Sequence, residues 1–264
     1  MSDCGTGNAL GAPNVAFTLI LLWALQVNTD STPSARALAR LLDDAQRYKV
    51  EQSIVARQRY GIKIEHLPDL SIRAAQRDDS NARALLRRAR QLEASQLTAE
   101  ELLSVAALRW ELDATIEGTQ YFWHRFGDVT PYSAPIQHVQ RVLGAFRFVD
   151  SSDVAQYLAL IAELPAWLDS IQGGVAERMR RGIRVPREEL PLIRTVFTSY
   201  NVAAAESPFW VGEERLTNIS AAERARFSAT LETELEGLIR PAFSRLLAYL
   251  DGPYTRGAPE RVGQ

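Results

Sequence analysis

The residue types that most often carry enzyme chemistry are scarce in this sequence. A catalytic zinc ion usually has three protein ligands, and two of them are commonly histidines placed by a helix. The only histidines are His66, His124 and His138, and none of them is followed by glutamate. A loop-like stretch rich in aromatic and proline residues separates His124 from His138. The sequence therefore predicts no zinc site within this chain.

Nucleophilic catalysis finds equally little support. The sequence contains no Gly-x-Ser-x-Gly motif, and its single cysteine, Cys4, precedes the first helix signal. Gly173-Gly174 is flanked by helix-like sequence, so it indicates a weak point in a helix rather than a loop that binds phosphate. An autonomous enzyme would have to use a site that none of these patterns reveals.

An aromatic run over residues 121–126 is the best candidate for a recognition surface. Its members are Tyr121, Phe122, Trp123, His124, Arg125 and Phe126, and a loop containing Pro131, Tyr132 and Pro135 follows. One interpretation is core packing, because burying one aromatic side chain stabilises a fold by about 1.5–3 kcal/mol. The other is the rim of a pocket, which the proline-rich loop favours. Both interpretations stay open at this point.

Charge gives no reason to expect a polyanionic partner. The net charge is −2 and the isoelectric point is near 6.0. Arginines do gather on one arc of the segment 71–96, at positions 73, 77, 83, 87, 88 and 90. Nucleic-acid binding would also need aromatic residues between them, and there are none. We therefore interpret the arc as a solvated helix face, with an anionic partner as the alternative.

Helices must position these side chains, because helix signals dominate the sequence. Helix starts are indicated at Thr32-Pro33, Ser71, the Thr98/Glu101 capping box, Ser151-Ser152-Asp153, Pro186 and Ser220/Glu223. We expect the first helix to reach Tyr60 with Gly61 as its stop, the second to be interrupted near residues 78–81, and Pro165 to begin or kink another that ends at Gly182. Convincing strand alternation is absent. The predicted fold is all-α, an array of long antiparallel helices.

The N-terminal segment is predicted to lie outside this helical body. Val15 to Leu25 is an almost unbroken apolar run, too short for the roughly 20 residues that span a bilayer, and no Lys or Arg precedes it. It is either a degenerate export signal or a buried segment, so exported and cytoplasmic locations both stay open. The predicted organisation is a segment over 1–30, one helical domain over 31–251 and a polar tail over 252–264.

Several segments together resemble the first half of the bacterial domain-of-unknown-function 885 family, whose members are similar to zinc-dependent peptidases. The resemblance covers roughly residues 35–264. Its stretches are 67–71, the helix into Glu111-Leu112, 129–132, 153–164, Arg181-Gly182-Ile183 with Pro186, Glu206-Ser207-Pro208-Phe209, and Arg240-Pro241-Ala242-Phe243 through Leu250.

The resemblance implies a zincin-like helical fold and a role without catalytic residues of its own. In the family, a His-Glu signature followed by Pro-Gly-His lies downstream of this region, so zinc is expected only with that C-terminal half. The implied role is the wall of a substrate channel for a peptide-like substrate. Candidate channel-facing residues are Tyr121, Trp123, His124, Pro131, Tyr132, Glu206, Ser207, Pro208 and Phe209.

Two functional hypotheses follow from these observations. The first is the N-terminal part of a zinc metallopeptidase-like hydrolase, catalytically incomplete as it stands. The alternative is a free-standing helical binding module without enzymatic activity. The first hypothesis predicts an uncovered apolar face for a missing half or for self-association, centred on residues 227–250 and including the loop 206–210. The alternative is that the run Val15 to Leu25 folds back and covers this face. At 100° per residue, Phe227, Leu231 and Leu238 share one side of that helix, while Phe243, Leu247 and Leu250 point elsewhere.

Overall fold

A computed structural model describes residues 31–131 and 135–259 of the chain. Every regular element in these ranges is a helix, which confirms the predicted all-α class. None of these helices is long and apolar enough to cross a membrane. The apolar run Val15–Leu25, Cys4 and Tyr132 lie outside the described residues.

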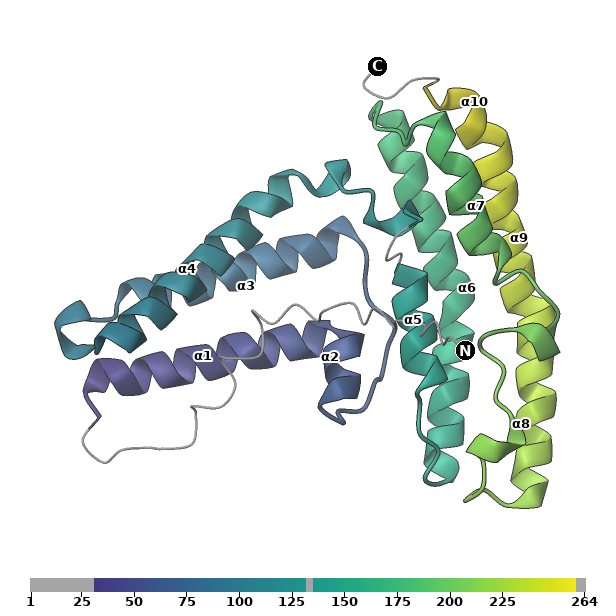
Figure 1. Ribbon diagram of the computed structural model, residues 1–264, viewed down its shortest axis with the longest axis horizontal. Coiled ribbons are helices and arrows are strands. Elements are labelled where there is room, and N and C mark those ends of the chain that lie inside the picture. The colour runs from purple at the N-terminus through teal and green to yellow at the C-terminus, as the bar shows by residue number, and fades with distance from the viewer. Residues whose placement is uncertain (1–30, 132–134, 260–264) are drawn as a thin grey trace, which may run out of the picture.

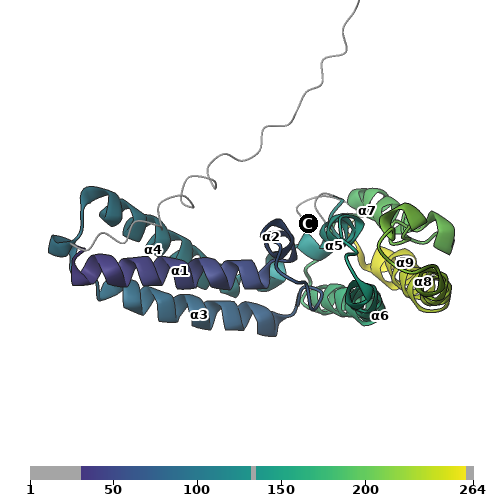
Figure 2. The ribbon, with the colours of Figure 1, turned by 90° about the horizontal axis from the view of Figure 1, so that it is seen from below.

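The helices form two bundles that meet at the middle of the molecule (Figure 1). The first, called the arm here, consists of α1 (Pro33–Gln52), α3 (Ile72–Arg90) and α4 (Ala99–Gln120). The second, called the body, contains α5 (Pro135–Gly144), α6 (Ser151–Arg180), α7 (Leu190–Thr198), α8 (Ala221–Glu234), α9 (Arg240–Tyr249) and α10 (Thr255–Gly257). The short helix α2 (Ile54–Arg59) packs against α5 and lies where the bundles meet (Figures 1 and 2).

Each bundle has its own hydrophobic core. The arm buries residues such as Leu41, Leu85 and Leu112 in one cluster, and the body buries a larger cluster along α6 and the C-terminal helices. Ile54 and Ile64 belong to the body cluster, although they follow α1 directly in the sequence. The connection between α1 and α3 is therefore packed on the body. The body core extends to Tyr254 and Ala258, beyond the predicted domain boundary at residue 251 and within the segment predicted as a polar tail.

Local capping explains where the arm helices begin. The side chains of Thr32 and Ser71 each accept a hydrogen bond from the backbone N–H three residues ahead. Thr98 and Glu101 form the reciprocal capping box that the sequence predicts for α4. Two boundaries differ from expectation. The first helix breaks at Ser53, where the backbone is extended and the side chain caps α2 by accepting from the Ala56 N–H. In addition, α3 runs unbroken through residues 78–81.

The central helix α6 is one continuous element of 30 residues. Pro165 lies inside it, so the prediction that this proline begins a helix is wrong, and the alternative that it kinks one stays a prediction. Gly182 ends α6 as predicted, with φ of +77°, a conformation that glycine adopts without a Cβ penalty. The Gly182 N–H donates to Met179 O at 3.1 Å and the Ile183 N–H to Arg178 O at 2.9 Å, which is the Schellman pattern.

The last helix does not carry the uncovered face that the sequence analysis predicts. Phe227, Phe243 and Leu250 are all buried in the body core, and among the apolar positions considered there only Leu238 is largely exposed, at 51%. The reason lies in the π-helical segment Leu235–Ile239, which separates Leu231 from Phe243. A π-helical turn holds more residues than an α-helical turn, so this segment turns Phe243 and Leu250 back toward the core. A second π-helical segment, Leu250–Tyr254, follows these positions.

Both π segments coincide with prolines. Pro241 lies just after the first one and Pro253 lies inside the second. Proline has no N–H to donate to the carbonyl four residues earlier, and its ring would contact that carbonyl in a regular α-helix. A wider turn relieves this contact. Pro241 therefore accounts for the register shift between Leu231 and Phe243, which a pattern drawn at a constant 100° per residue does not anticipate.

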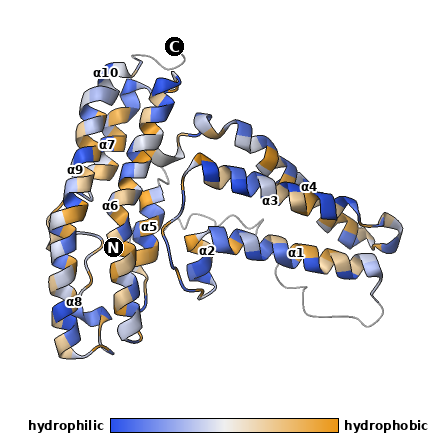
Figure 3. Cartoon of the chain, turned by 180° about the vertical axis from the view of Figure 1, so that it is seen from behind, coloured by the Kyte–Doolittle hydropathy of each residue, from blue (hydrophilic) through white to orange (hydrophobic). Residues whose placement is uncertain are grey.

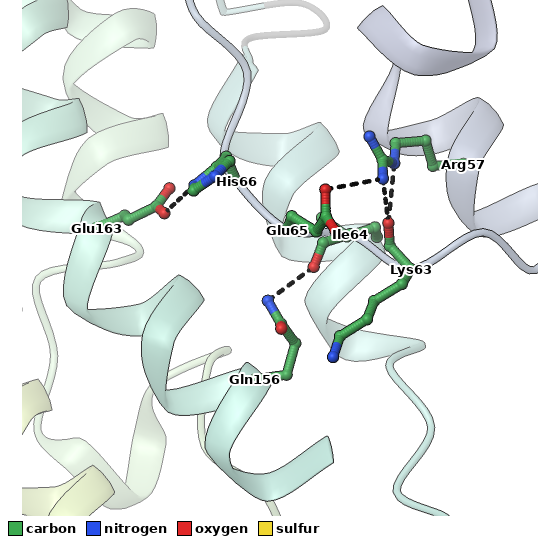
Figure 4. A network of polar contacts seen from close by, with 7 residues as sticks. All are labelled: Arg57, Lys63, Ile64, Glu65, His66, Gln156 and Glu163. Carbon is green, nitrogen blue, oxygen red and sulfur yellow. Dashed lines mark hydrogen bonds and ion pairs between the residues drawn. The ribbon is translucent and has the colours of Figure 1, made fainter. Parts of the chain in front are cut away.

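An extended connector, residues 61–71, docks the arm on α6 (Figure 4). Glu163 accepts a hydrogen bond from the Leu67 N–H at 2.8 Å, and its other oxygen lies 2.7 Å from His66 Nδ1. Gln156 donates to Ile64 O at 2.9 Å, and Trp167 Nε1 donates to Pro68 O at 2.8 Å. Positions 156, 163 and 167 share one face of α6. That face satisfies connector backbone groups that have no strand or helix partner.

Candidate functional site

The aromatic run over residues 121–126 forms a turn at the end of α4. Tyr121 caps α4, and Phe122–His124 make a single 3₁₀ turn. The ring of Phe122 meets the ring of Trp123 edge to face, with centroids 4.9 Å apart. Tyr121 and His124 are exposed, and Trp123 is half-buried. The turn is therefore part packing and part surface, which combines the two interpretations of the sequence.

Two arginines from the last turns of α6 lie over these rings. The guanidinium carbon of Arg181 is 4.5 Å from the centroid of the Trp123 ring. That of Arg178 is 5.9 Å from the Phe122 ring and 6.0 Å from the Trp123 ring. A guanidinium within about 6 Å of an aromatic face is attracted to it, and the contact strengthens when water is excluded. Arg178 is only 3% exposed, so its charge depends on these rings and on its other protein contacts.

The C-terminal end of α6 favours positive charge. The backbone carbonyls of its last turn carry the negative end of the helix dipole, and arginines in that turn offset the charge. Glu177 pairs with both Arg180 and Arg181, and its contact with Arg181 Nε is 2.8 Å. These contacts hold the Arg181 guanidinium in a fixed orientation over Trp123. A planar guanidinium held in this way can bind a carboxylate or phosphate through its remaining N–H groups.

Residues 184–187, which follow α6, contact the C-terminal helix and add two more arginines to this basic end. Arg184 donates to Gly257 O, and the Arg187 N–H donates to Pro259 O at 3.0 Å. The Val185 N–H donates to the hydroxyl of Tyr254 at 2.8 Å, and burial raises the pKa of that hydroxyl above its ordinary value. These contacts keep the arginine-rich segment 178–187 close to α10.

The second group of candidate residues, 206–209, packs elsewhere in the body. Phe209 is fully buried, and its ring stacks on Tyr200 with centroids 5.8 Å apart. Its carbonyl accepts a hydrogen bond from the Tyr157 hydroxyl at 2.7 Å. Ser207 is buried and its hydroxyl accepts from the Phe209 N–H at 3.2 Å, whereas Glu206 is exposed and Pro208 half-buried. The buried members of this segment therefore shape the core of the body.

The two groups lie far apart on α6. Tyr157, which contacts Phe209, precedes Arg178 by 21 residues of the same helix. At about 1.5 Å of rise per residue, the two contacts are roughly 30 Å apart along the helix axis. Pro131 is half-buried in the loop that follows the aromatic turn. Of the described candidates, the structure brings Tyr121, Trp123 and His124 together and leaves 206–209 separate.

The described residues do not fit a zinc ion. His66 is on the connector beside Glu163, His124 is in the aromatic turn and His138 is in α5. Among the residues that the structure describes, no group of three or more His, Cys, Asp and Glu side chains could hold a metal ion. The zinc expected with a C-terminal half remains a prediction about that half.

Sequence reasoning missed the part that α6 plays in this site. Arg178 and Arg181 hold the aromatic turn, and neither was among the candidate residues. A signal was present, because five arginines occur within residues 178–187 and Glu177 precedes Arg181 by four positions. Their apposition to residues 122 and 123, more than fifty positions earlier in the chain, is decided by the packing of the bundles.

The chain matches a known protein family. A family model described as "Bacterial protein of unknown function (DUF885)" matches residues 55–264, which is most of the chain. The matched range begins in α2 and includes the connector, the aromatic turn and the whole body. A search of curated proteins finds no match.

Proposed function

The chain belongs to the DUF885 family, and on that premise we propose that it is the N-terminal, substrate-channel-forming part of a zinc metallopeptidase-like hydrolase. In this proposal the zinc ion and the catalytic residues belong to a further segment with the His-Glu and Pro-Gly-His motifs. This chain contributes binding surface and no reacting group. The substrate is peptide-like.

The observation that supports a binding role is the pairing of Arg181 with Trp123. The aromatic rings of Trp123 and the exposed Tyr121 offer apolar contact. The oriented guanidinium of Arg181 offers a hydrogen-bond donor for carboxylate groups. A peptide carries both kinds of group in its side chains and at its C-terminus. The turn lies at one end of α6, where a substrate can approach from solvent.

Retention of peptides on the immobilised chain tests this proposal. The probe is a tryptic digest of casein, and mass spectrometry identifies the retained peptides. We expect retention by the wild-type chain and its loss in Trp123→Ala and Arg181→Ala. Arg83→Ala is the matched control, because it removes the same charge from α3 in the arm. Absence of retention by the wild type, or equal retention by Arg181→Ala and Arg83→Ala, would contradict the proposal.

The alternative is a free-standing helical binding module without enzymatic activity. The observation that favours it is an exposed apolar face on α4, which is described below. A purified chain that is monodisperse and unfolds cooperatively, and that gains no peptidase activity when mixed with a segment carrying the His-Glu motif, would support this alternative over the hydrolase.

A further inference from the structure

The outer face of α4 carries apolar side chains that no other described element covers. Leu103 is 70% exposed, Trp110 is 73% exposed and Tyr121, at the C-terminal cap, is 53% exposed. Ala107 and Ala114 between them are exposed as well. The opposite side of the same helix is buried in the arm core through Val105, Leu108 and Leu112. Figure 3 shows apolar residues distributed along α4. A helix that is apolar beyond its core-facing side usually has a second partner.

The exposed residues follow the spacing of a helix-pairing seam. Positions 103, 107, 110, 114, 117 and 121 alternate steps of four and three residues. This is the a/d repeat through which one helix packs against another. The alanines leave room for a second helix to approach closely, and Trp110 lies near the centre of the seam. A large central aromatic side chain is a common anchor of binding energy.

The charged side chains in and beside the seam are acidic. Glu117 occupies a seam position, and Asp113 and Glu111 lie beside the seam, at positions that set partner choice in paired helices. Glu111 is paired with Lys49 of α1. Arg109, the one basic residue of α4, donates to Ala89 O of α3 at 2.7 Å. Arg83 of α3, which lines the same hollow as Asp113, is paired with Asp79.

We propose that this seam of α4 binds an amphipathic helix of a partner polypeptide, with an apolar stripe flanked by lysine or arginine. A second copy of this chain fits poorly, because two such seams would bring Asp113 and Glu117 against like charges. The N-terminal segment of the chain fits poorly too, because residues 1–30 contain no Lys or Arg. The proposal is independent of any hydrolase role.

Two designed peptides of equal length test the proposal. Both have leucine at the a and d positions of the heptad repeat, and one has lysine and the other glutamate at the e and g positions. Fluorescence anisotropy of each labelled peptide is measured against the full chain. We expect the lysine peptide to bind at least about tenfold more tightly than the glutamate peptide, and its affinity to fall as salt is added.

Variants of the seam show where the peptide binds. We expect Trp110→Glu or Leu103→Glu to weaken binding of the lysine peptide by about tenfold or more. Leu192→Glu, which places the same charge on an exposed leucine of α7, should not weaken it. The double variant Asp113→Lys/Glu117→Lys should reverse the preference between the two peptides. Circular dichroism of each variant checks that it folds.

Four results would overturn the proposal. The first is equal binding of the two peptides, and the second is unchanged binding by Trp110→Glu. A dimer in light scattering that Trp110→Glu dissociates would assign the seam to a second copy of the chain. Tighter binding of the lysine peptide after deletion of residues 1–30 would assign it to the N-terminal segment.

Discussion

At the scale of single residues, buried tyrosines link the segments of the body. Tyr157 from α6 donates to the carbonyl of Phe209, and its ring contacts Phe146, Phe148 and Phe227 edge-on or tilted. Tyr200 donates to Gln140 Oε1 at 2.6 Å and stacks on Phe209 and Phe243. The Tyr157 hydroxyl satisfies a carbonyl inside the apolar core, where an unpaired polar group is costly, and the Tyr200 hydroxyl satisfies the half-buried amide of Gln140.

Replacing Tyr157 by phenylalanine tests the strength of one of these links. The ring remains in Tyr157→Phe, but the buried carbonyl of Phe209 loses its donor. We expect the free energy of unfolding to fall by about 1–2 kcal/mol, measured by urea denaturation. Tyr249→Phe is the matched control, because its hydroxyl makes only a long contact of 3.9 Å to Met179 Sδ. Equal losses in the two variants would contradict this assignment.

Alkaline pH should lower the free energy of unfolding, because the buried Tyr200 has a raised pKa. Burial raises the pKa of Tyr200 to about 12, from an unfolded value near 10. Between these two values the folded state keeps a proton that the unfolded state has lost, so stability falls as pH rises. We expect a lower free energy of unfolding at pH 11 than at pH 9, and a smaller drop in Tyr200→Phe. An equal drop in both proteins would show that other groups cause it.

At the scale of elements, the C-terminal helix shows how register depends on helix type. Its apolar residues drift around the axis when they are drawn at a constant angle per residue, yet the core buries both Phe227 and Phe243. The π segment Leu235–Ile239, which lies between them, takes up the drift. Within residues 31–131 and 135–259, the outer seam of α4 is an apolar face that no other helix covers.

Replacement by alanine should change the stability in opposite directions at Gly173, within α6, and at Gly182, just after it. Gly182 has φ of +77°, so Gly182→Ala strains the backbone even though nothing lies within 4 Å of the added Cβ. We expect a loss of about 1 kcal/mol. Gly173 lies in an exposed part of α6 with open space around it, so Gly173→Ala should add about 0.5–1 kcal/mol. Thermal unfolding of both variants measures the difference, and shifts of the same sign would contradict the assignment.

At the scale of the whole molecule, two cores share one chain. The arm core is the smaller, and the connector that joins α1 to α3 packs on the body through Glu163 and Trp167. A small bundle with few buried apolar residues opens at lower cost than a large one. The arm should therefore be the less stable part.

We expect two unfolding transitions, of which the arm gives the first. Leu41→Ala removes a side chain from the arm core and should lower the first transition only, by about 2–5 kcal/mol. Phe243→Ala should lower the second, by about 3–5 kcal/mol. Hydrogen exchange with mass spectrometry separates the two by following α4 and α6 individually. A single transition that both variants shift equally would show that the bundles unfold together.

The sequence by itself determined the helical class and many helix ends. The reason is that capping is local: Ser71, Thr98 and Gly182 act through backbone groups within five residues, so their effect can be recognised without knowing the fold. The resemblance carried by short segments is confirmed at the level of the family.

Only the tertiary structure decided which of these segments meet. The sequence grouped residues 121–132 with 206–209. In the structure, Phe122 and Trp123 pack beside Arg178 and Arg181, whereas Phe209 contacts Tyr157 at a different level of α6. The burial of Phe209 and the exposure of Trp110 likewise depend on neighbours far away in the chain. Long-range packing and the π-helical register set these positions, and neither follows from spacing along one helix.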